Sequence, residues 1–227
     1  MASLSKLLDY TLVNKTYNIL ADEQLTINNN PTYLKEDWDK SVFTTLKGNI
    51  RKHYGRRQNR KCAYCRLTIN PDAYGNAIEH IMPRKHKPQW MFVQHNLTVA
   101  CIGCNSSKGS DNTMISHENN YGHNANHCPS NSNEFKIFNP HFDKWSDHFE
   151  IQDKFFLVPK PNTKGPATYK FCNMHRYQIV LDYIDVLNSR KKSFKSITGR
   201  LRKEKRNYVK VELEKAKESI LDFIENS

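Results

Sequence analysis

Two short motifs, Cys62-Ala-Tyr-Cys65 and Cys101-Ile-Gly-Cys104, decide the fold of this chain. Each is a C-x2-C knuckle that presents two thiolates on one tight turn, and two knuckles complete a tetrahedral shell of sulfur atoms that suits Zn²⁺. Such a shell has no open coordination position, so we expect this zinc to be structural. Because the intervening segment is short and polar, metal binding would supply folding energy that a thin core cannot. Buried free thiols are the alternative interpretation.

The 35 residues between Cys65 and Cys101 exceed the usual spacing in a zinc finger, so we expect an insertion there. Three motifs lie in or just beyond it: Glu79-His80-Ile-Met-Pro83, His95-Asn96-Leu97 and, after the second knuckle, Asn105-Ser-Ser-Lys108-Gly109. Taken singly, His80, Asn96 and Asn105 are typical of surface or turn residues. Their joint occurrence, in this order and around paired knuckles, makes the pattern specific.

These motifs resemble those of the HNH nuclease family, over residues 60–112 or about a quarter of the chain. In that family an acidic residue, His, Ile and Pro lie on a first strand, and Asn-Leu opens a second. Cys-x2-Cys-Asn-x2-Lys-Gly then leads into a helix. The resemblance implies an α+β fold, in which a ββα-metal (HNH) finger is held by a zinc site of four cysteines and flanked by N- and C-terminal helices.

The resemblance also implies a role for each residue of the site. His80 would be the general base that takes a proton from the attacking water, and a neutral imidazole suits that task. Glu79 and Asn105 would be oxygen ligands of one catalytic Mg²⁺ or Mn²⁺. Asn96 would brace an irregular loop that lets Glu79 and His80 converge, since adjacent strand residues point to opposite faces. Many members have Asp in place of Glu79 and His in place of Asn105.

The chain is basic, with a formal net charge of +12, which favours a polyanionic partner. Residues 47–66 carry eight Lys or Arg and no acid, next to the first knuckle, and we expect Arg56, Arg57 and Arg60 to contact nucleic acid. Arg84 and Lys108 are further candidates for phosphate contacts. Residues 190–206 hold nine basic residues against Glu204 alone, and a solvated surface is the alternative for both runs.

Three regions are expected: an N-terminal helical region at 1–58, an HNH nuclease domain at 59–118, and a C-terminal extension at 119–227. Hydrophobic spacing and turn residues indicate helices at 4–20, 35–54, from Asn105, at 173–189 and at 203–225. Short strands are expected at 77–82, 97–100, 136–138 and 155–158. Residues 117–133, which are rich in Asn, Ser, His and Gly, should form an irregular loop.

The segment Phe138-Asn-Pro-His-Phe-Asp-Lys-Trp-Ser-Asp-His-Phe149 is similar to one in HNH proteins of bacterial retrons and of the Septu antiphage system. That similarity implies an effector nuclease restrained by a regulatory ATPase subunit, together with a retron reverse transcriptase and its DNA. A packing strap, with Trp145 and Phe149 covering the finger, is the alternative. No apolar run is long enough for a bilayer, and no secretion signal is evident, so a cytoplasmic protein without a membrane partner is expected.

Metal-dependent endonuclease activity is therefore the main functional prediction, with DNA favoured as the substrate and RNA, such as tRNA, second. A zinc-dependent nucleic-acid-binding module without turnover is the alternative, and a scaffold subunit with a degenerate finger is a third. The set of His80, Glu79 and Asn105 favours the enzyme, because a binding module has no need of a base beside two oxygen ligands. His123, His127 and Cys128 could mark a second metal, and Cys172 is expected to be a small buried residue.

Overall fold

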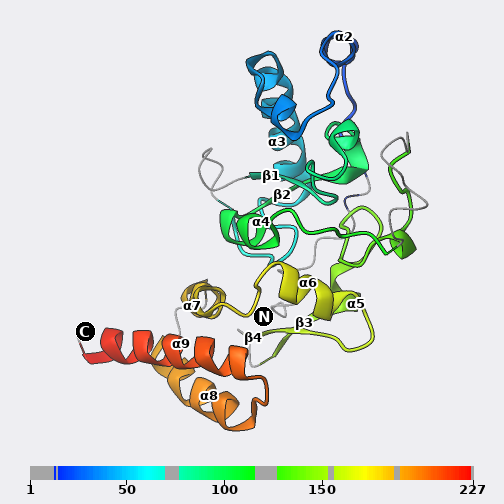
Figure 1. The fold of residues 1–227 in the computed structure, drawn as a ribbon. Coiled ribbons are helices and arrows are strands. Elements are labelled where there is room, and N and C mark those ends of the chain that lie inside the picture. The colour runs from blue at the N-terminus through cyan, green and yellow to red at the C-terminus, as the bar shows by residue number, and fades with distance from the viewer. Residues whose placement is uncertain are drawn as a thin grey trace.

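The computed structural model describes residue 13 and residues 15–69, 77–115, 127–152, 156–186 and 190–225. In these parts of the chain, helices, short 3-10 turns and two separate two-stranded sheets form an α+β structure. Figure 1 shows α3 (Thr44–Arg57) and the sheet of β1 (Ala77–His80) and β2 (Leu97–Ala100) in the upper part of the molecule. The lower part holds α7 (Tyr177–Val186), α8 (Arg190–Lys203) and α9 (Asn207–Glu225). None of the described helices is both long and apolar enough to span a membrane.

The N-terminal helices differ from the prediction. Of the helix expected at 4–20, residues 13 and 15–20 are not helical, and residues 4–12 and 14 lie outside the described part. The first described helix is α2 (Ala21–Asn29). The helix expected at 35–54 is instead two 3-10 turns, η1 (Lys35–Asp39) and η2 (Ser41–Phe43), followed by α3. Lys40, with φ −55° and ψ 132°, is extended and separates the two turns. Because of this break, Val42 is not on the predicted buried face but is 46% exposed.

Helix α3 packs on the β1–β2 sheet through the buried side chains of Leu46, Ile50 and Tyr54. Its last turn is joined to the sheet by Gln58, whose side chain is buried. The Gln58 Oε1 accepts hydrogen bonds from Thr98 Oγ1 (2.7 Å) and Val99 N (2.9 Å), and its Nε2 donates to Val99 O (2.8 Å). Gln58 thus satisfies backbone groups on the open edge of β2, as a neighbouring strand would.

Two strands, β1 and β2, precede the second knuckle, and a helix begins within it. β1 and β2 are antiparallel, with Ala77 opposite Ala100 and His80 opposite Leu97. The expected strand 77–82 therefore ends at His80, whereas 97–100 has the predicted bounds. Helix α4 (Ile102–Lys108) begins three residues before Asn105, the position expected from the sequence. It begins there because the Cys101 sulfur caps it by accepting from Cys104 N (3.4 Å).

The C-terminal extension packs around a second antiparallel sheet, β3 (Phe149–Gln152) with β4 (Phe156–Pro159). Before and after it lie α5 (Trp145–His148) and α6 (Gly165–Phe171). The strand expected at 136–138 is absent, and only a single bridge, Met114 with Phe135, forms next to it. Helix α8 was not predicted. Helix α9 packs towards the core through four buried apolar residues: Val209, Leu213, Ala216 and Ile220. Residues 117–126 of the loop expected at 117–133, including His123, lie outside the described part.

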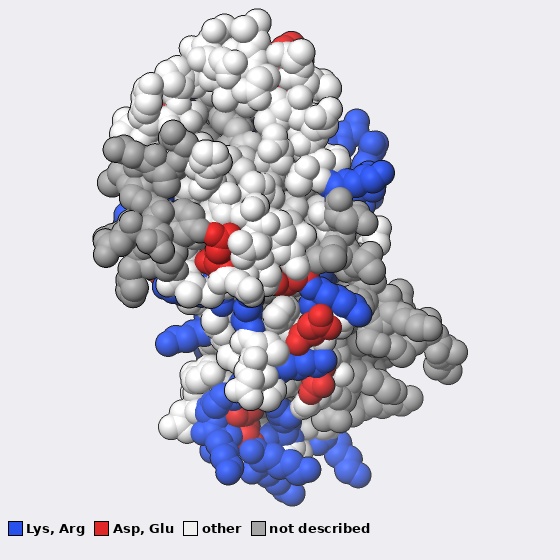
Figure 2. All heavy atoms as spheres, turned by 90° about the vertical axis from the view of Figure 1, so that its right-hand side faces the viewer, with Lys and Arg blue, Asp and Glu red and all other residues white. Residues whose placement is uncertain are grey.

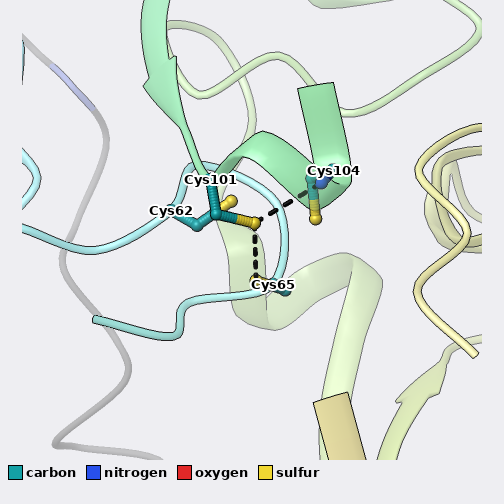
Figure 3. A group of neighbouring side chains, drawn as sticks. All are labelled: Cys62, Cys65, Cys101 and Cys104. Atoms are coloured by element: carbon teal, nitrogen blue, oxygen red, sulfur yellow. Dashed lines mark hydrogen bonds between the residues drawn. The ribbon is translucent and has the colours of Figure 1, made fainter. Parts of the chain in front are cut away.

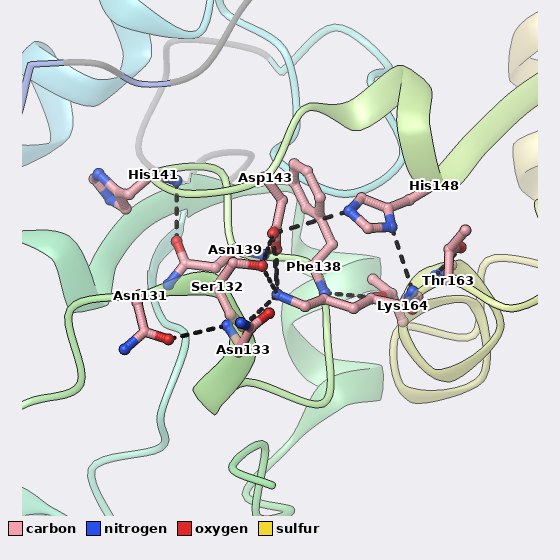
Figure 4. Close-up of polar contacts among 12 residues, drawn as sticks. Asn131, Ser132, Asn133, Phe138, Asn139, His141, Asp143, His148, Thr163 and Lys164 are labelled. Atoms are coloured by element: carbon pink, nitrogen blue, oxygen red, sulfur yellow. Dashed lines mark hydrogen bonds and ion pairs between the residues drawn. The ribbon is translucent and has the colours of Figure 1, made fainter.

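Residues 138–149 are held by a buried carboxylate (Figure 4). Asp143 accepts hydrogen bonds from Asn139 N (2.8 Å), Ser132 Oγ (2.5 Å) and Lys164 Nζ (2.7 Å). Trp145, from the same segment, is buried and donates from Nε1 to Tyr64 O (2.7 Å) in the first knuckle. These contacts support the packing interpretation of this segment, because its polar residues are engaged inside the fold.

His141 connects the same segment to the β1–β2 sheet and gives a test by pH. Its Nε2 donates to Leu97 O (2.7 Å), and burial lowers its pKa to about 4. The unfolded chain binds this proton near pH 6.5, so stability falls as pH decreases from there towards 4. We expect His141 to remove about 2 kcal/mol from the free energy of unfolding between pH 7 and pH 4.5. In His141→Gln this part of the pH dependence of the unfolding free energy, measured by denaturant titration, should disappear. If the unfolding free energies of the two proteins changed with pH in parallel, the role of His141 would be contradicted.

Candidate functional site

The two knuckles bring their four cysteines together (Figure 3). All four sulfur atoms lie within 4.8 Å of one another, and Cys65 Sγ is 3.9 Å from Cys101 Sγ. Four sulfurs bound to zinc at about 2.3 Å would be about 3.8 Å apart, so the cluster fits a tetrahedral shell. None of the six cysteines forms a disulfide. The cluster can hold a structural metal such as zinc, and sulfur fills every position of that shell.

Backbone geometry explains why the first knuckle closes. Ala63 N donates to Val99 O (3.0 Å), which ties this turn to β2. Arg66 N donates back to Cys62 O (3.1 Å), and Arg66 itself adopts the left-handed conformation at φ 62°. Its buried guanidinium lies over the rings of Phe138 and Trp145 (5.7 and 5.6 Å). The basic run at 47–66 therefore does not lie wholly on the surface.

Arg176 contacts the sulfur cluster, a role that no motif in the sequence indicates. Its Nη2 lies 3.6 Å from Cys101 Sγ and 3.5 Å from Cys104 Sγ, while Nη1 donates to Cys172 O (3.1 Å) and Asn173 O (3.0 Å). Burial would lower the pKa of Arg176, but the sulfurs, Cys104 first, raise it above its usual value. The guanidinium thus offsets part of the negative charge of a four-thiolate site.

Gly103 makes room for that guanidinium. A Cβ atom at this position would lie 2.8 Å from Arg176 Nη2, closer than van der Waals contact allows. A larger residue at this position would therefore have to displace the end of the Arg176 side chain, which lies far along the chain. Nothing in the local sequence indicates this contact.

Beside the cluster is a pocket of about 310 Å³, formed by β1, α4 and the loop after β1. It brings together most of the predicted site residues. Its lining comprises Lys35, Ile78, Glu79, His80, Pro83, Arg84, Lys85, Asn105, Ser106, Lys108, Gly109 and Ser110. Asn96 is not part of this lining. Asn105 is half-buried on α4, one turn after Cys101, whose carbonyl accepts from Asn105 N (3.0 Å).

His80 is held in one tautomer. Its Nε2 is 3.1 Å from Met91 O, and because a carbonyl only accepts, Nε2 must carry the proton. The lone pair of the neutral ring is then on Nδ1, which makes no hydrogen bond within the described residues. Burial, followed by the charge of Arg84, lowers the pKa of His80 to about 3, so the ring is neutral near pH 7. Trp38 packs edge-on against it at 4.5 Å between ring centroids.

Glu79 is nearly enclosed. Its Oε1 accepts a hydrogen bond from Tyr64 Oη (2.9 Å) and forms an ion pair with Lys108 Nζ (2.9 Å). Burial raises the pKa of Glu79, and Lys108 opposes that rise. Both partners use Oε1, so Oε2 is the oxygen without a hydrogen bond to a described residue. Lys108 was expected to contact phosphate, but its side chain is 1% exposed and faces Glu79 instead.

The strand geometry at this point is regular. Glu79 pairs with Thr98 and His80 with Leu97 in the β1–β2 register, so the two side chains leave opposite faces of the sheet. The irregular loop that the resemblance implies begins only after His80. Glu79 reaches the pocket wall from the side of α4, where it contacts Lys108, and His80 reaches it from the side of Trp38.

Asn96 provides the bracing that the resemblance implies. Its side chain is fully buried, and Oδ1 accepts from Met82 N (2.7 Å). The Nδ2 group donates to Met82 O (3.2 Å) and Trp90 O (3.3 Å), at the two ends of the loop after β1. Because Trp90 precedes Met91, whose carbonyl holds His80, Asn96 fixes the ring of His80 indirectly.

The predicted nucleic-acid contacts are divided between two places. Arg84 lines the pocket, donates to Lys35 O (2.9 Å) and lies over the Trp38 ring. Arg56, Arg57 and Arg60 are exposed around the end of α3, away from the pocket lining. A separate hollow of about 280 Å³ lies there, lined by Gly48, Arg51, Lys52, Gly55, Arg56, Arg60 and Ile69.

The other histidines and cysteines do not form a second metal site in the described part of the chain, where the four knuckle cysteines are the only cluster of metal-binding side chains. Cys172 is fully buried, as predicted, and Cys128 is nearly so. His86 and His95 lie near backbone carbonyls, those of Ser110 (2.6 Å) and Cys128 (3.4 Å). Comparison of the chain with protein-family models, curated proteins and solved structures finds no match.

Removal of two sulfurs tests the structural role of the cluster. In Cys101→Ser with Cys104→Ser, we expect loss of bound zinc and a decrease in unfolding free energy on the order of 5 kcal/mol or more. Cys128→Ser, outside the cluster, should retain one zinc per chain. The measurements are metal content and thermal unfolding, and an unchanged melting temperature in the double variant would contradict the structural role.

Gly103→Ala tests the contact of Arg176 with the sulfurs. The new methyl group should displace the guanidinium, and loss of such an outer contact weakens metal affinity by about tenfold. Zinc should therefore transfer faster to a chelator. Gly48→Ala in α3 is the matched control, because a Cβ there meets nothing within 4 Å, and it should leave zinc release unchanged. Equal release rates in both variants would show that Arg176 does not support the site.

Proposed function

We propose that this protein is a metal-dependent endonuclease that hydrolyses phosphodiester bonds in nucleic acid, with His80 as the general base. The observation that carries the proposal is the fixed ring of His80 at the wall of a pocket that also contains Glu79 and Asn105. A neutral imidazole with its lone pair on Nδ1 is the form that a general base requires. The resemblance of these motifs to the HNH family supports the same activity.

The proposed reaction is direct hydrolysis. His80 Nδ1 removes a proton from water, and the oxygen of that water forms a bond to phosphorus. The bond between phosphorus and the 3′ oxygen breaks, that oxygen gains a proton from solvent water, and His80 returns its proton to solvent. The products are a 5′-phosphate and a 3′-hydroxyl. Arg84 at the pocket wall supplies a positive charge that suits a bound phosphate.

The proposed catalytic ion is Mg²⁺ or Mn²⁺. Hard divalent cations prefer oxygen ligands, and Glu79 Oε2 and Asn105 Oδ1 are donors of that kind among the residues of the pocket. When bound, such an ion stabilises charge on the phosphate and on the leaving oxygen. The Lys108 ammonium on Oε1 holds Glu79 in place, and its charge lessens the pull of Glu79 on a cation.

That ion pair is also the observation that favours a second candidate, a zinc-dependent nucleic-acid-binding module without turnover. In such a protein Lys108 would neutralise Glu79 permanently, and phosphate would bind to Arg84 without a metal ion. DNA remains the favoured polymer, with RNA such as tRNA second. The similarity of residues 138–149 is the sole support for an effector role in antiphage defence, with a regulatory ATPase and a retron reverse transcriptase as partners.

The test is cleavage of plasmid DNA, total RNA and tRNA with Mg²⁺ or Mn²⁺. We expect His80→Ala to lower the cleavage rate by about 10²- to 10⁴-fold, because the general base is lost, and to retain its zinc. His86→Ala is the matched control, since this nearby histidine lies outside the pocket lining. Undiminished cutting by a folded His80→Ala protein would refute the assignment. Binding without cutting of any of these polymers by the wild type would favour the second candidate.

A further inference from the structure

The basic run at 190–206 contains one acid, and that acid faces inward. Glu204 is 8% exposed and lies in the turn between α8 and α9. Its carboxylate binds Arg206 (2.8 and 2.9 Å) and lies 3.6 Å from Arg200 Nη2, and it accepts from the backbone N of Lys205 (3.1 Å) and Arg206 (3.0 Å). Hydrogen bonds from Arg206 lower the pKa of Glu204 to about 2. Glu204 therefore fixes the turn, and its negative charge is paired with Arg200 and Arg206.

The remaining cations around this turn point to solvent. Five of them are exposed and form no ion pair with a described residue: Lys195, Arg202, Lys203, Lys205 and Lys210. We call these five residues the α8–α9 patch. Figure 2 shows Lys and Arg gathered at the lower end of the molecule, where Figure 1 places α8 and α9, with few acids among them. Farther along α9 the lysines are neutralised, since Lys215 pairs with Glu212 and Lys217 with Glu214.

An exposed aromatic residue, Tyr208, lies in the first turn of α9, between Lys205 and Lys210 in the sequence. Tyr208 is 49% exposed, and His175 packs against its ring edge-on at 4.7 Å between centroids. An oriented, exposed aromatic ring among basic side chains suits stacking with an unpaired base while the cations follow the phosphates. A membrane surface fits less well, because Val211 is the only other large apolar residue exposed in the described side chains of α8 and α9.

We propose that the α8–α9 patch, with Tyr208, is an anchoring surface for nucleic acid that has unpaired bases. Its role in cleavage rests on the proposed endonuclease function, whereas binding itself does not. In Figure 1 helices α8 and α9 lie at the lower end of the molecule, and α7 lies between them and the β1–β2–α4 region. Because the patch contributes nothing to the lining of the His80 pocket, it should affect substrate affinity and leave the chemical step unchanged.

The experiment measures binding without cleavage, on the His80→Ala protein in the absence of Mg²⁺. The readout is fluorescence polarisation of labelled single-stranded DNA and RNA. These probes are about 20 nucleotides long, so that they exceed one binding site. Adding Arg202→Ala, Lys203→Ala and Lys205→Ala should weaken binding at least tenfold. The slope of log affinity against log salt should fall by about 2, because about 0.7 counterions are released per single-strand phosphate. Lys215→Ala with Lys217→Ala is the matched control and should change affinity less than twofold.

Three further measurements identify the kind of partner that binds the patch. Tyr208→Ala should weaken single-strand binding at least fivefold and duplex binding less. Lys210→Glu, a single surface change, should weaken both and guards against misfolding of the triple variant. If the triple variant had the same affinity and salt slope as the His80→Ala protein, the proposal would be overturned. It would also be overturned if the His80→Ala protein bound phosphatidylserine vesicles but not nucleic acid. A wild type that binds through the patch but never cuts would refute the endonuclease and leave this surface standing.

Discussion

Closure of the four sulfurs is the constraint on which the rest of this structure depends. It joins the end of α3 to the β2–α4 junction, and the candidate site is built on these elements. Tyr64, inside the first knuckle, donates to Glu79, and α4 carries Asn105 and Lys108 into the same pocket. A structural metal ion would therefore set the positions of residues that do not touch it.

The C-terminal extension contacts both knuckles instead of standing apart from them. Trp145 binds the carbonyl of Tyr64 in the first knuckle, and Arg176 contacts the sulfurs of the second. Both contacts join segments that are more than 70 residues apart. Buried polar contacts of this kind are costly to break, because each leaves an unpaired group. These contacts cross the boundary that was expected at residue 118.

The local parts of this site could be predicted from sequence. Paired knuckles fix their own geometry, and Leu97–Ala100 has the pattern of a buried strand. The long-range parts could not. The sequence indicates that Lys108 is a surface cation, because spacing does not show that α4 turns its side chain towards Glu79. Arg176 is far in sequence from the cysteines whose sulfur atoms it contacts. Helix α8 was missed because its three regularly spaced apolar residues, Phe194, Ile197 and Leu201, lie within a basic run that resembles a solvated segment. The burial of Glu204 is visible only once α9 is in place.

X-ray absorption at the zinc edge of the purified protein tests the central claim most directly. One zinc per chain, surrounded by four sulfur atoms at about 2.3 Å and by no nitrogen or oxygen, is the predicted result. Such a shell would establish the closed metal site that joins the elements around the His80 pocket. A shell that contains nitrogen or oxygen ligands, or a protein that folds and remains stable with no metal bound, would contradict this account.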